Sequence, residues 1–287
     1  MRVITPLRYP GGKACLAPVI SAVMDANRIM RPIMAEPYAG GAGASLELLF
    51  SERVKSVLIN DLDYRIFSFW WAMLNHTDRF LEWIDSVPLS IREWKRQRII
   101  YRNPRKHNRF EVGFASFYLN RTNHSGILIN GGPIGGIKQE GKWHIDARFA
   151  RRTLADRIER IAAYKDRIVL SNLDAMAFVS RIVKNHAAQE LFIYLDPPYY
   201  KKGAKLYLSY YDHSDHVVLG ESLRVCRHPN WVVTYDDVPA IRAVYKKCQI
   251  LPFRMQYTAQ NRREGAELFI APEKLILPLK LLHGIGY

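Results

Sequence analysis

Short apolar runs alternate along the chain with longer stretches of helical periodicity. The apolar runs cover residues 32–35, 54–59, 167–170, 190–195 and 231–234. Stretches with helical spacing or length follow them, among them residues 44–50, 64–74, 175–183 and 213–226. Alternation of this kind indicates βαβ units, in which helices cover both sides of a parallel sheet. The pattern therefore predicts an α/β fold.

One internal segment breaks this alternation. Between residues 76 and 162, helix-like stretches at 91–101, 111–121 and 150–164 surround a glycine-rich loop at 130–136. The segment reads as a helical insertion in an α/β domain. We therefore expect one domain built from residues 1–75 and 163–287, with an inserted helical domain at residues 76–162.

Charge is distributed unevenly over the 287 residues. The chain has 42 Lys and Arg against 27 Asp and Glu, and residues 91–160 alone hold 16 Lys and Arg against six acids. An exposed helix face normally interleaves both signs. A net charge of +10 on one segment, out of +15 in total, therefore predicts contact with a polyanion, and nucleic acid is the expected partner.

Several classes of protein are excluded. The three cysteines, Cys15, Cys226 and Cys248, lack the spacing of a zinc site or a disulfide framework. His213 and His216 have no further ligands nearby in sequence, so we expect no metal. The first thirty residues lack the apolar core of a signal peptide, and no apolar run approaches the roughly 18 residues of a membrane span. We expect a cytoplasmic protein that does not bind membranes.

A glycine cluster after the first apolar run indicates a cofactor site. Residues 34–46 contain Gly40, Gly41 and Gly43, but Leu46 stands where a dinucleotide site has its third glycine. Glu36 would suit a cationic ligand better than a pyrophosphate. Asp61 follows the second run, where such folds bind a ribose diol, while Asp63 suits a helix N-cap. An acidic, ribose-binding site of this kind suggests S-adenosylmethionine.

The most specific motif is Asp196-Pro197-Pro198-Tyr199, which follows the apolar run 190–195. The N6 amine of adenine is a poor nucleophile because its lone pair is delocalised into the ring. A carboxylate and a backbone carbonyl that accept its two N–H bonds free that lone pair. Prolines lack a backbone N–H, so they present carbonyls on a rigid turn, and Tyr199 offers a face for base stacking. The motif predicts methylation of an exocyclic amine.

Together these motifs make the chain similar to the Dam-like class of DNA adenine-N6 methyltransferases over almost its full length. The matching segments are residues 9–13, 36–43, Asp61, 117–122, 196–199 and 257–268. The resemblance implies a Rossmann-like S-adenosylmethionine-dependent methyltransferase sheet with an inserted helical target-recognition domain. It also implies that the enzyme flips an adenine out of duplex DNA before methylating it.

Site residues follow from the resemblance and the charge pattern. The expected catalytic residues are Asp196, Pro197, Pro198 and Tyr199. The expected cofactor-binding residues are Tyr9, Gly11, Gly12, Lys13, Glu36, Pro37, Tyr38, Gly40, Gly43, Asp61, Asn172, Leu173 and Asp196. The expected DNA-binding residues are Lys95, Arg96, Arg98, Asn120, Arg121, Thr122, Asn123, His124, Lys138, Lys201 and Arg262. Residues 200–211 are expected to close over the flipped base, and residues 260–265 to clamp the DNA backbone.

The resemblance also marks a departure. GATC-methylating members have an aromatic residue at the position of His124 and a guanine-reading Arg at the position of Ile129. Since Arg paired with guanine is the commonest specific contact, another target sequence is expected. Two alternatives stay open, which are methylation of adenine in RNA and a catalytically inactive nucleic-acid-binding module. We expect a monomer or weak dimer of bacterial or phage origin, acting on double-stranded DNA.

Overall fold

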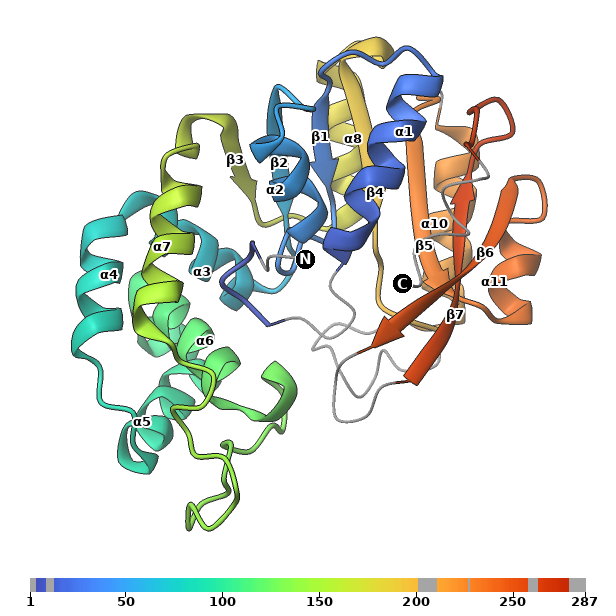
Figure 1. Ribbon diagram of the computed structural model, residues 1–287. Helices are drawn as coiled ribbons and strands as arrows, with labels where there is room; N and C mark the ends of the chain where they lie inside the picture. Colours follow the sequence, from blue (N-terminus) through green and yellow to red (C-terminus); the bar gives the residue numbers. More distant parts are fainter. Residues whose placement is uncertain (1–3, 9–12, 201–210, 227, 258–262, 279–287) are drawn as a thin grey trace. The chain divides into compact units, whose positions relative to one another are not determined.

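The computed structural model describes residues 4–8, 13–200, 211–226, 228–257 and 263–278, except for the side chains of residues 255–257 and 263–264. The chain divides into two compact units (Figure 1). Met1–Gly12 and Asp63–Asp166 form what we call the helical unit, and Lys13–Leu62 and Arg167–Tyr287 form the sheet unit. Each unit is described by itself.

The sheet unit is built on a seven-stranded sheet with the order β3-β2-β1-β4-β5-β7-β6. The strands are β1 (Ile33–Glu36), β2 (Ser56–Asn60), β3 (Ile168–Ser171), β4 (Leu191–Leu195), β5 (Trp231–Asp236), β6 (Gln249–Tyr257) and β7 (Arg263–Ala271). The first five in the chain pair in parallel, at the five apolar runs of the sequence. The sheet is not parallel throughout, because β7 is antiparallel to β5 and β6. Only five residues join β6 to β7, too few for the crossover that parallel neighbours need.

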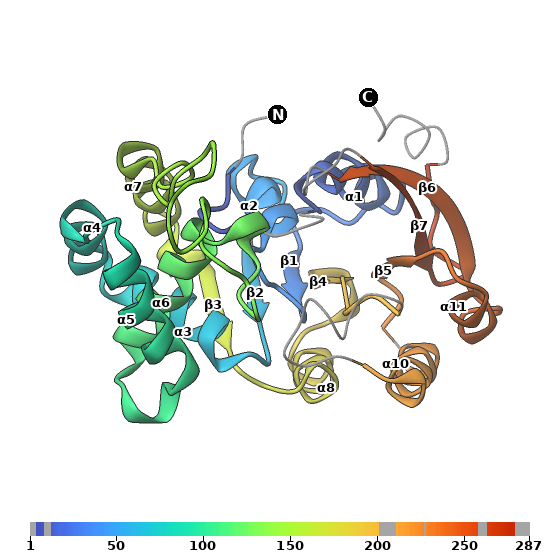
Figure 2. The same ribbon diagram turned by 90° about the horizontal axis from the view of Figure 1, so that it is seen from below.

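Helices cover both faces of this sheet. They are α1 (Ala17–Ala26), α2 (Gly43–Phe50), α8 (Ala175–Asn185), α10 (His213–Val225) and α11 (Pro239–Val244), with 3-10 turns η1 (Lys13–Leu16) and η5 (Ala188–Glu190). Figure 2 shows α1 and α2 on one face and α8 and α10 on the other. All five residues of β4 are buried, as expected for a central strand packed on both sides. Leu219 of α10 and Phe178 of α8 join Ile193 of β4 in one apolar core.

Within its described residues, 4–8 and 63–166, the helical unit has five α-helices. They are α3 (Tyr64–Asn75), α4 (Thr77–Ser86), α5 (Ile91–Arg102), α6 (Arg109–Thr122) and α7 (Arg151–Ala162), with 3-10 turns η2 (Pro104–Lys106), η3 (His124–Gly126) and η4 (Lys165–Arg167), the last reaching the unit boundary. A capping box of Asn108 and Glu111 begins α6. Helices α3 and α6 pack closely at Gly113, where a Cβ atom would lie 2.2 Å from the Ser68 carbonyl oxygen. Within the described ranges, no helix is long and apolar enough to cross a lipid bilayer.

The helical unit begins earlier than residue 76, the boundary predicted from sequence. Its second segment starts at Asp63, so α3 belongs to it. The reason is packing, since Phe69 of α3 stacks on Phe117 of α6 with ring centroids 6.0 Å apart. The N-terminal segment belongs to it as well, because the backbone of Arg8 hydrogen-bonds the side chain of Asn120. Helix α4, which the apolar pattern did not single out, lies within the predicted insertion.

Candidate active site

Acidic side chains gather at the carboxyl edge of the parallel strands. Glu36 is the last residue of β1, Asp61 directly follows β2, and Asp196 directly follows β4. Because β1 pairs in parallel with both β2 and β4, these three residues leave the sheet at the same edge. Ligands of open α/β sheets bind at that edge. The structure thus brings together three acids that the sequence selected for cofactor binding or catalysis.

A buried amide joins the turns that follow three neighbouring strands. Asn60, the last residue of β2, is fully buried. Its Nδ2 donates to the carbonyl oxygens of Pro37 and Leu173 at 3.0 Å each. Its Oδ1 accepts from Ser171 Oγ and from the Leu173 backbone N–H, both at 2.9 Å. The predicted cofactor residues Pro37 and Leu173 are therefore held by Asn60, which is not among the residues predicted from sequence.

Asp61 links the turn after β1 to the turn after β2. Its Oδ2 accepts a hydrogen bond of 2.9 Å from the backbone N–H of Gly40. Gly40 has a φ of +47°, a conformation that glycine adopts without the Cβ penalty. Asn172 Nδ2 donates to the Asp61 carbonyl oxygen at 2.7 Å. Gly40, Asp61 and Asn172 thus lie together, while Asp63 caps α3 as predicted.

Glu36 is buried in a position that disfavours its charge. It is 4% exposed, and Ser45 Oγ of α2 donates a hydrogen bond to its carboxylate. Burial raises the pKa of Glu36 to about 8, with Asp196 and Asp61 adding to the increase and Ser45 opposing it. A cation placed beside such a group favours its ionised form. This environment supports the expectation that Glu36 serves a cationic ligand.

Asp196 is fixed through one of its two carboxylate oxygens. Thr234 Oγ1 of β5 donates to Asp196 Oδ1 at 2.7 Å. Burial raises the pKa of the Asp196 carboxyl, whereas the ammonium of Lys13 lowers it. The side chain of Asp196 is 25% exposed. Pro197 and Pro198 follow directly and have no backbone N–H, so this turn presents acceptors rather than donors.

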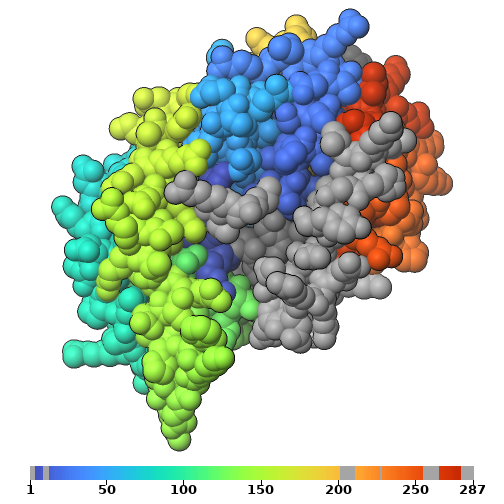
Figure 3. All heavy atoms as spheres, in the orientation of Figure 1, coloured from blue at the N-terminus to red at the C-terminus, as the bar shows by residue number. Residues whose placement is uncertain are grey.

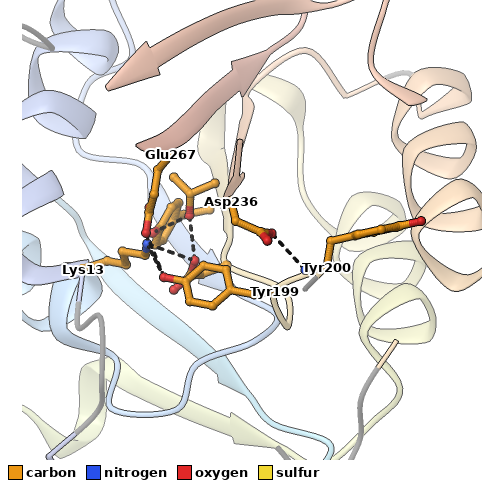
Figure 4. A network of polar contacts seen from close by, with 8 residues as sticks. Lys13, Tyr199, Tyr200, Asp236 and Glu267 are labelled. Atoms are coloured by element: carbon orange, nitrogen blue, oxygen red, sulfur yellow. Dashed lines mark hydrogen bonds and ion pairs between the residues drawn. The ribbon is translucent and has the colours of Figure 1, made fainter. Parts of the chain in front are cut away.

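The buried side chains of Lys13, Tyr199 and Glu267 form a ring of polar contacts (Figure 4). Lys13 Nζ forms an ion pair with Glu267 and donates to the Tyr199 hydroxyl at 3.1 Å. The Tyr199 hydroxyl donates to Glu267 Oε1 at 2.8 Å. Lys13 Nζ also lies 3.7 Å from Asp196 Oδ1. The Asp-Pro-Pro-Tyr turn is therefore tied to η1 and β7 by the predicted residues Lys13 and Tyr199.

Glu267 was not among the residues selected from sequence. The sequence feature that could have marked Glu267 is its position directly before an apolar run, residues 268–271, which is buried. Its role depends on the pairing of β7 with β5, which brings Glu267 opposite Asp236, and a local motif does not report that pairing. Tyr199 is only 9% exposed, so its stacking on a base stays a prediction.

Further contacts hold the chain that follows the Asp-Pro-Pro-Tyr motif. The backbone N–H of Tyr200 donates to Asp236 Oδ1 at 2.9 Å (Figure 4). The hydroxyls of Tyr38 and Tyr211 are 2.7 Å apart. Gly43, also a predicted cofactor residue, begins α2. Among the described residues, no group of three or more His, Cys, Asp or Glu side chains could hold a metal ion.

Some predicted positions lie outside the described residues. They are Tyr9, Gly11 and Gly12 of the cofactor set, and Lys201 and Arg262 of the DNA-binding set. Most of the expected closing segment 200–211 and the first part of the expected clamp 260–265 also lie outside. These assignments stay predictions.

Four predicted DNA-binding residues of the helical unit are buried, namely Asn120, Arg121, Thr122 and Asn123. Asn120 hydrogen-bonds the backbone of Arg8, the Arg121 guanidinium donates to the Arg148 carbonyl, and the Asn123 Oδ1 accepts from the Trp94 indole at 2.7 Å. We therefore correct the expectation that these four side chains contact DNA directly. Thr122 Oγ1 donates to the Tyr118 carbonyl, and the Asn120 and Asn123 amides donate to the Gly126 and Ile127 carbonyls, which helps to fix the loop that follows α6.

Other predicted DNA-binding residues of the helical unit do lie on its surface. Lys95, Arg96, His124 and Lys138 are exposed. Arg98 is half-buried, with its guanidinium 4.9 Å from the Trp94 ring centroid. A surface hollow of about 570 Å³ is lined by Arg92, Lys95, Arg96, Ile99, Ile100, His107 and Glu111. Four of these seven residues are basic or His, so the hollow favours an anionic ligand.

Residues 135–147 form a projecting loop, which we call the finger. It is the yellow-green extension between α6 and α7 in Figures 1 and 3. Gln139 braces it from inside, because its Nε2 donates to the Ile134 and Gly136 carbonyls and its Oε1 accepts from the Ile145 N–H. Ile137 and Trp143 are 52% and 62% exposed. An ordered loop with exposed apolar and basic side chains suits contact with a partner.

The fold and the acidic edge define a class of protein. A sheet of this strand order, with a glycine turn after β1 and acids at the ends of β1, β2 and β4, is that of a Rossmann-like S-adenosylmethionine-dependent methyltransferase. This fold prediction is confirmed. The chain belongs to the D12 class N6 adenine-specific DNA methyltransferase family, whose family model matches residues 9–259. The predicted resemblance is therefore confirmed.

The individual proteins that resemble this chain have low sequence identity to it. A type II methyltransferase, M.MjaIII of Methanocaldococcus jannaschii, is 26% identical over 175 residues, and the match covers 57% of each chain. This chain thus spans little more than half of that relative. A structure from Pyrococcus horikoshii, assigned provisionally as an RNA methyltransferase, aligns over 92% of this chain and 84% of its own at 10% identity, with a TM-score of 0.41. The rRNA methyltransferase aviRa from Streptomyces viridochromogenes aligns over 92% and 86% at 12% identity, with a TM-score of 0.36.

The methyltransferase family implies S-adenosylmethionine as the methyl donor, and the residues at the carboxyl edge fit it. Glu36, Asp61 and Asp196 are acceptors that suit a ligand with sulfonium and ammonium charges and ribose hydroxyls. The ammonium of Lys13 is paired with Glu267. That pairing leaves this edge acidic in character, which suits a cation better than a pyrophosphate.

Proposed function

We propose that this chain is a site-specific DNA adenine-N6 methyltransferase that acts on a flipped adenine in duplex DNA. One observation carries the proposal. Asp196, on the Pro-Pro turn of a D12-family chain, is fixed at Oδ1 by Thr234 while its side chain keeps some exposure. A carboxylate held in this way is prepared to accept an N–H of an exocyclic amine.

We assign to the Asp-Pro-Pro-Tyr turn the role of accepting hydrogen bonds from the adenine amine. Asp196 accepts one N–H bond of the adenine amine, and the Pro197 carbonyl accepts the other, which returns the lone pair to nitrogen. Bound S-adenosylmethionine would supply an electrophilic methyl group, whose bond to sulfur breaks as the bond to N6 forms; the thioether S-adenosylhomocysteine would be the leaving group, and the amine would lose one proton. The Tyr199 ring stacks on the base, and Pro198 keeps the turn rigid. Holding the amine in line with the methyl carbon supplies the entropic part of the acceleration.

The cofactor is assigned to the edge formed by β1 and β2. We assign Asp61 to the ribose hydroxyls and Glu36 to the cationic part of the cofactor, beside the turn of Pro37, Tyr38 and Gly40. Asn172 and Leu173 are assigned to the side of its adenine. The hydrogen bonds that connect Asp61 to Gly40 and Asn172 support this grouping.

DNA binding is assigned to the surface of the helical unit. The exposed residues Lys95, Arg96 and Lys138, together with the half-buried Arg98 of α5, are assigned to phosphates. The finger and His124 are assigned to the groove, near the bases. The concentration of basic residues in this unit supports the assignment, because phosphate neutralisation supplies most of non-specific DNA affinity.

The recognised sequence is proposed to differ from GATC. His124 and Ile129 stand where GATC-methylating members of the resembled class have an aromatic residue and an Arg. We further propose that the enzyme is a monomer or weak dimer that modifies bacterial or phage DNA, as the modifying half of a restriction-modification pair. Methylation-sensitive sequencing of DNA from expressing cells identifies the target, and sedimentation measures the oligomeric state.

A substrate competition tests the proposal. The protein is incubated with tritiated S-adenosylmethionine and a mixed pool of duplex DNA and RNA, and each polymer is then isolated and counted. We expect label in DNA only, with none when Asp196→Ala, which lacks the acceptor, replaces the wild type. Label confined to RNA would establish the RNA alternative. Absence of label with intact cofactor binding would establish an inactive binding module.

A further inference from the structure

Glu267 is a charged residue in an apolar place. It lies in β7 and is fully buried, and the residues that follow it, Leu268, Phe269 and Ile270, are all core residues. A carboxylate is retained in such a position only when it is paired and hydrogen-bonded, because its desolvation is costly. The partners of Glu267 therefore indicate what it does.

Both oxygens of Glu267 are used, and both partners belong to the active site. Oε1 accepts the Tyr199 hydroxyl at 2.8 Å, and Oε2 pairs with Lys13 Nζ. Lys13 also donates to the Tyr199 hydroxyl at 3.1 Å. The three groups come from β7, from η1 and from the turn after β4, so Glu267 joins parts of the chain that are far apart in sequence.

Two carboxylates compete for the ammonium of Lys13. It lies within hydrogen-bond distance of Glu267 but 3.7 Å from Asp196 Oδ1, beyond the length of an N–H···O bond. Asp196 Oδ1 takes a hydrogen bond from Thr234 instead. If Glu267 lost its charge, Asp196 would become the nearest anion to Lys13 and would be drawn into the pair.

We propose that Glu267 is a positioning residue for methyl transfer. It fixes the Tyr199 hydroxyl and holds Lys13 back from Asp196, so that the Asp196 carboxylate stays available to the adenine amine. The inference rests on the proposed function, because the amine is the group for which Asp196 is kept available. A purely structural Glu267 would affect stability, whereas a positioning Glu267 affects the rate of transfer.

The variant Glu267→Gln tests this role. Gln has the same shape and retains an oxygen that can accept from Tyr199, but it lacks the charge that holds Lys13. We expect kcat to fall by about tenfold to a hundredfold, while KM for DNA and the Kd for S-adenosylmethionine change by less than about threefold. Glu273→Gln, at an exposed position a few residues after β7, is the matched control and should leave kcat unchanged.

The same substitution made in a Lys13→Met protein separates the restraint of Lys13 from the other effects of Glu267→Gln. In Lys13→Met protein there is no ammonium to restrain. Glu267→Gln should then lower kcat by less than about threefold beyond Lys13→Met alone, because two residues that act through one contact are not additive. Independent contributions would multiply instead and would contradict the proposed restraint.

The outcomes distinguish this inference from the proposed function. A wild-type protein that methylates no DNA overturns the proposed function and the inference with it. An active wild type whose Glu267→Gln variant keeps its kcat overturns the inference alone. A loss confined to KM or to the melting temperature assigns Glu267 a structural role only, which also overturns it.

Discussion

The sheet unit and the helical unit use their charged residues differently. The sheet unit has 21 Lys and Arg against 16 acids, and the helical unit has 21 against only 11 in a shorter length of chain. At the candidate active site, Lys13 and Glu267 are buried and paired. On the helical unit, Lys95 and Lys138 are exposed. Buried pairs fix geometry for chemistry, whereas unbalanced surface charge provides affinity for a polyanion.

The largest effect is expected in the sheet unit, from Asp196→Ala. Transfer to DNA should fall by about a thousandfold or more, because the variant loses the group that accepts the amine N–H. Single-turnover methylation measures the rate, and calorimetry measures cofactor binding, which should largely survive. Equal losses of rate and cofactor affinity would mean that Asp196 binds the cofactor rather than the amine. Asp78→Ala, an exposed residue in α4 of the helical unit, is the control.

The next effect is expected in the helical unit, from the double variant Arg96→Gln with Arg98→Gln. Loss of two phosphate contacts should flatten the slope of log K against log salt by about 1.8. Titrations of a fluorescent duplex at several salt concentrations measure this. The matched control is Arg181→Gln with Lys184→Gln, which removes the same charge from exposed positions of α8 in the sheet unit. Equal slopes for the two double variants would contradict the assignment of DNA binding to the helical unit.

Close packing in the helical unit gives a third test, through stability. Gly113→Ala places a Cβ 2.2 Å from the Ser68 carbonyl oxygen, so α3 and α6 must separate. We expect a loss of about 1 to 3 kcal/mol in the free energy of unfolding. Gly132→Ala is the control, since a Cβ there meets no atom within 4 Å. Chemical denaturation distinguishes the two, and equal stabilities would contradict the packing of α3 on α6.

The smallest effect is a pH dependence that depends on Glu36. Its pKa is raised to about 8 by burial, and a bound cation would lower it, so binding is coupled to loss of a proton. Affinity for S-adenosylmethionine should therefore rise with pH up to about 8, by at most about tenfold per pH unit. Isothermal titration between pH 6 and 8.5 measures this, and Glu36→Gln should flatten the dependence. An unchanged slope in the variant would remove Glu36 from the cofactor site.

The same group has an opposite effect on stability. Because the folded-state pKa of Glu36 exceeds its ordinary value of 4.5, the folded protein binds the proton more tightly than the unfolded chain. The contribution of Glu36 to stability is fully present below pH 4.5 and is lost as the pH rises through about 8. Glu36→Gln should remove this decline.

The sequence predicted the parts of the molecule that local patterns determine. The five apolar runs became the five parallel strands, and the motif acids Glu36, Asp61 and Asp196 came to one edge because parallel strands end together. Asn60, Thr234 and Glu267 were not selected. Each of these three side chains hydrogen-bonds a residue that is distant in the chain. Only the strand order of the sheet identifies that residue.

The helical unit shows where residue type misleads. The charge run located its basic surface, since Lys95 and Arg96 are exposed. The polar block at the end of α6 resembled a DNA-facing segment, but Asn120 and Asn123 are buried. Their amides satisfy backbone groups of Arg8 and Ile127, and such a use is indistinguishable from a surface role in sequence alone.

The most direct test of the account is the chemical identity of the methylated base. The protein is incubated with duplex DNA and S-adenosylmethionine carrying a deuterated methyl group, and the DNA is digested to nucleosides for mass spectrometry. We expect deuterated N6-methyladenine from the wild type and none from Asp196→Ala, which lacks the acceptor for the amine N–H. Deuterium in N4-methylcytosine, or equal N6-methyladenine from both proteins, would contradict the account.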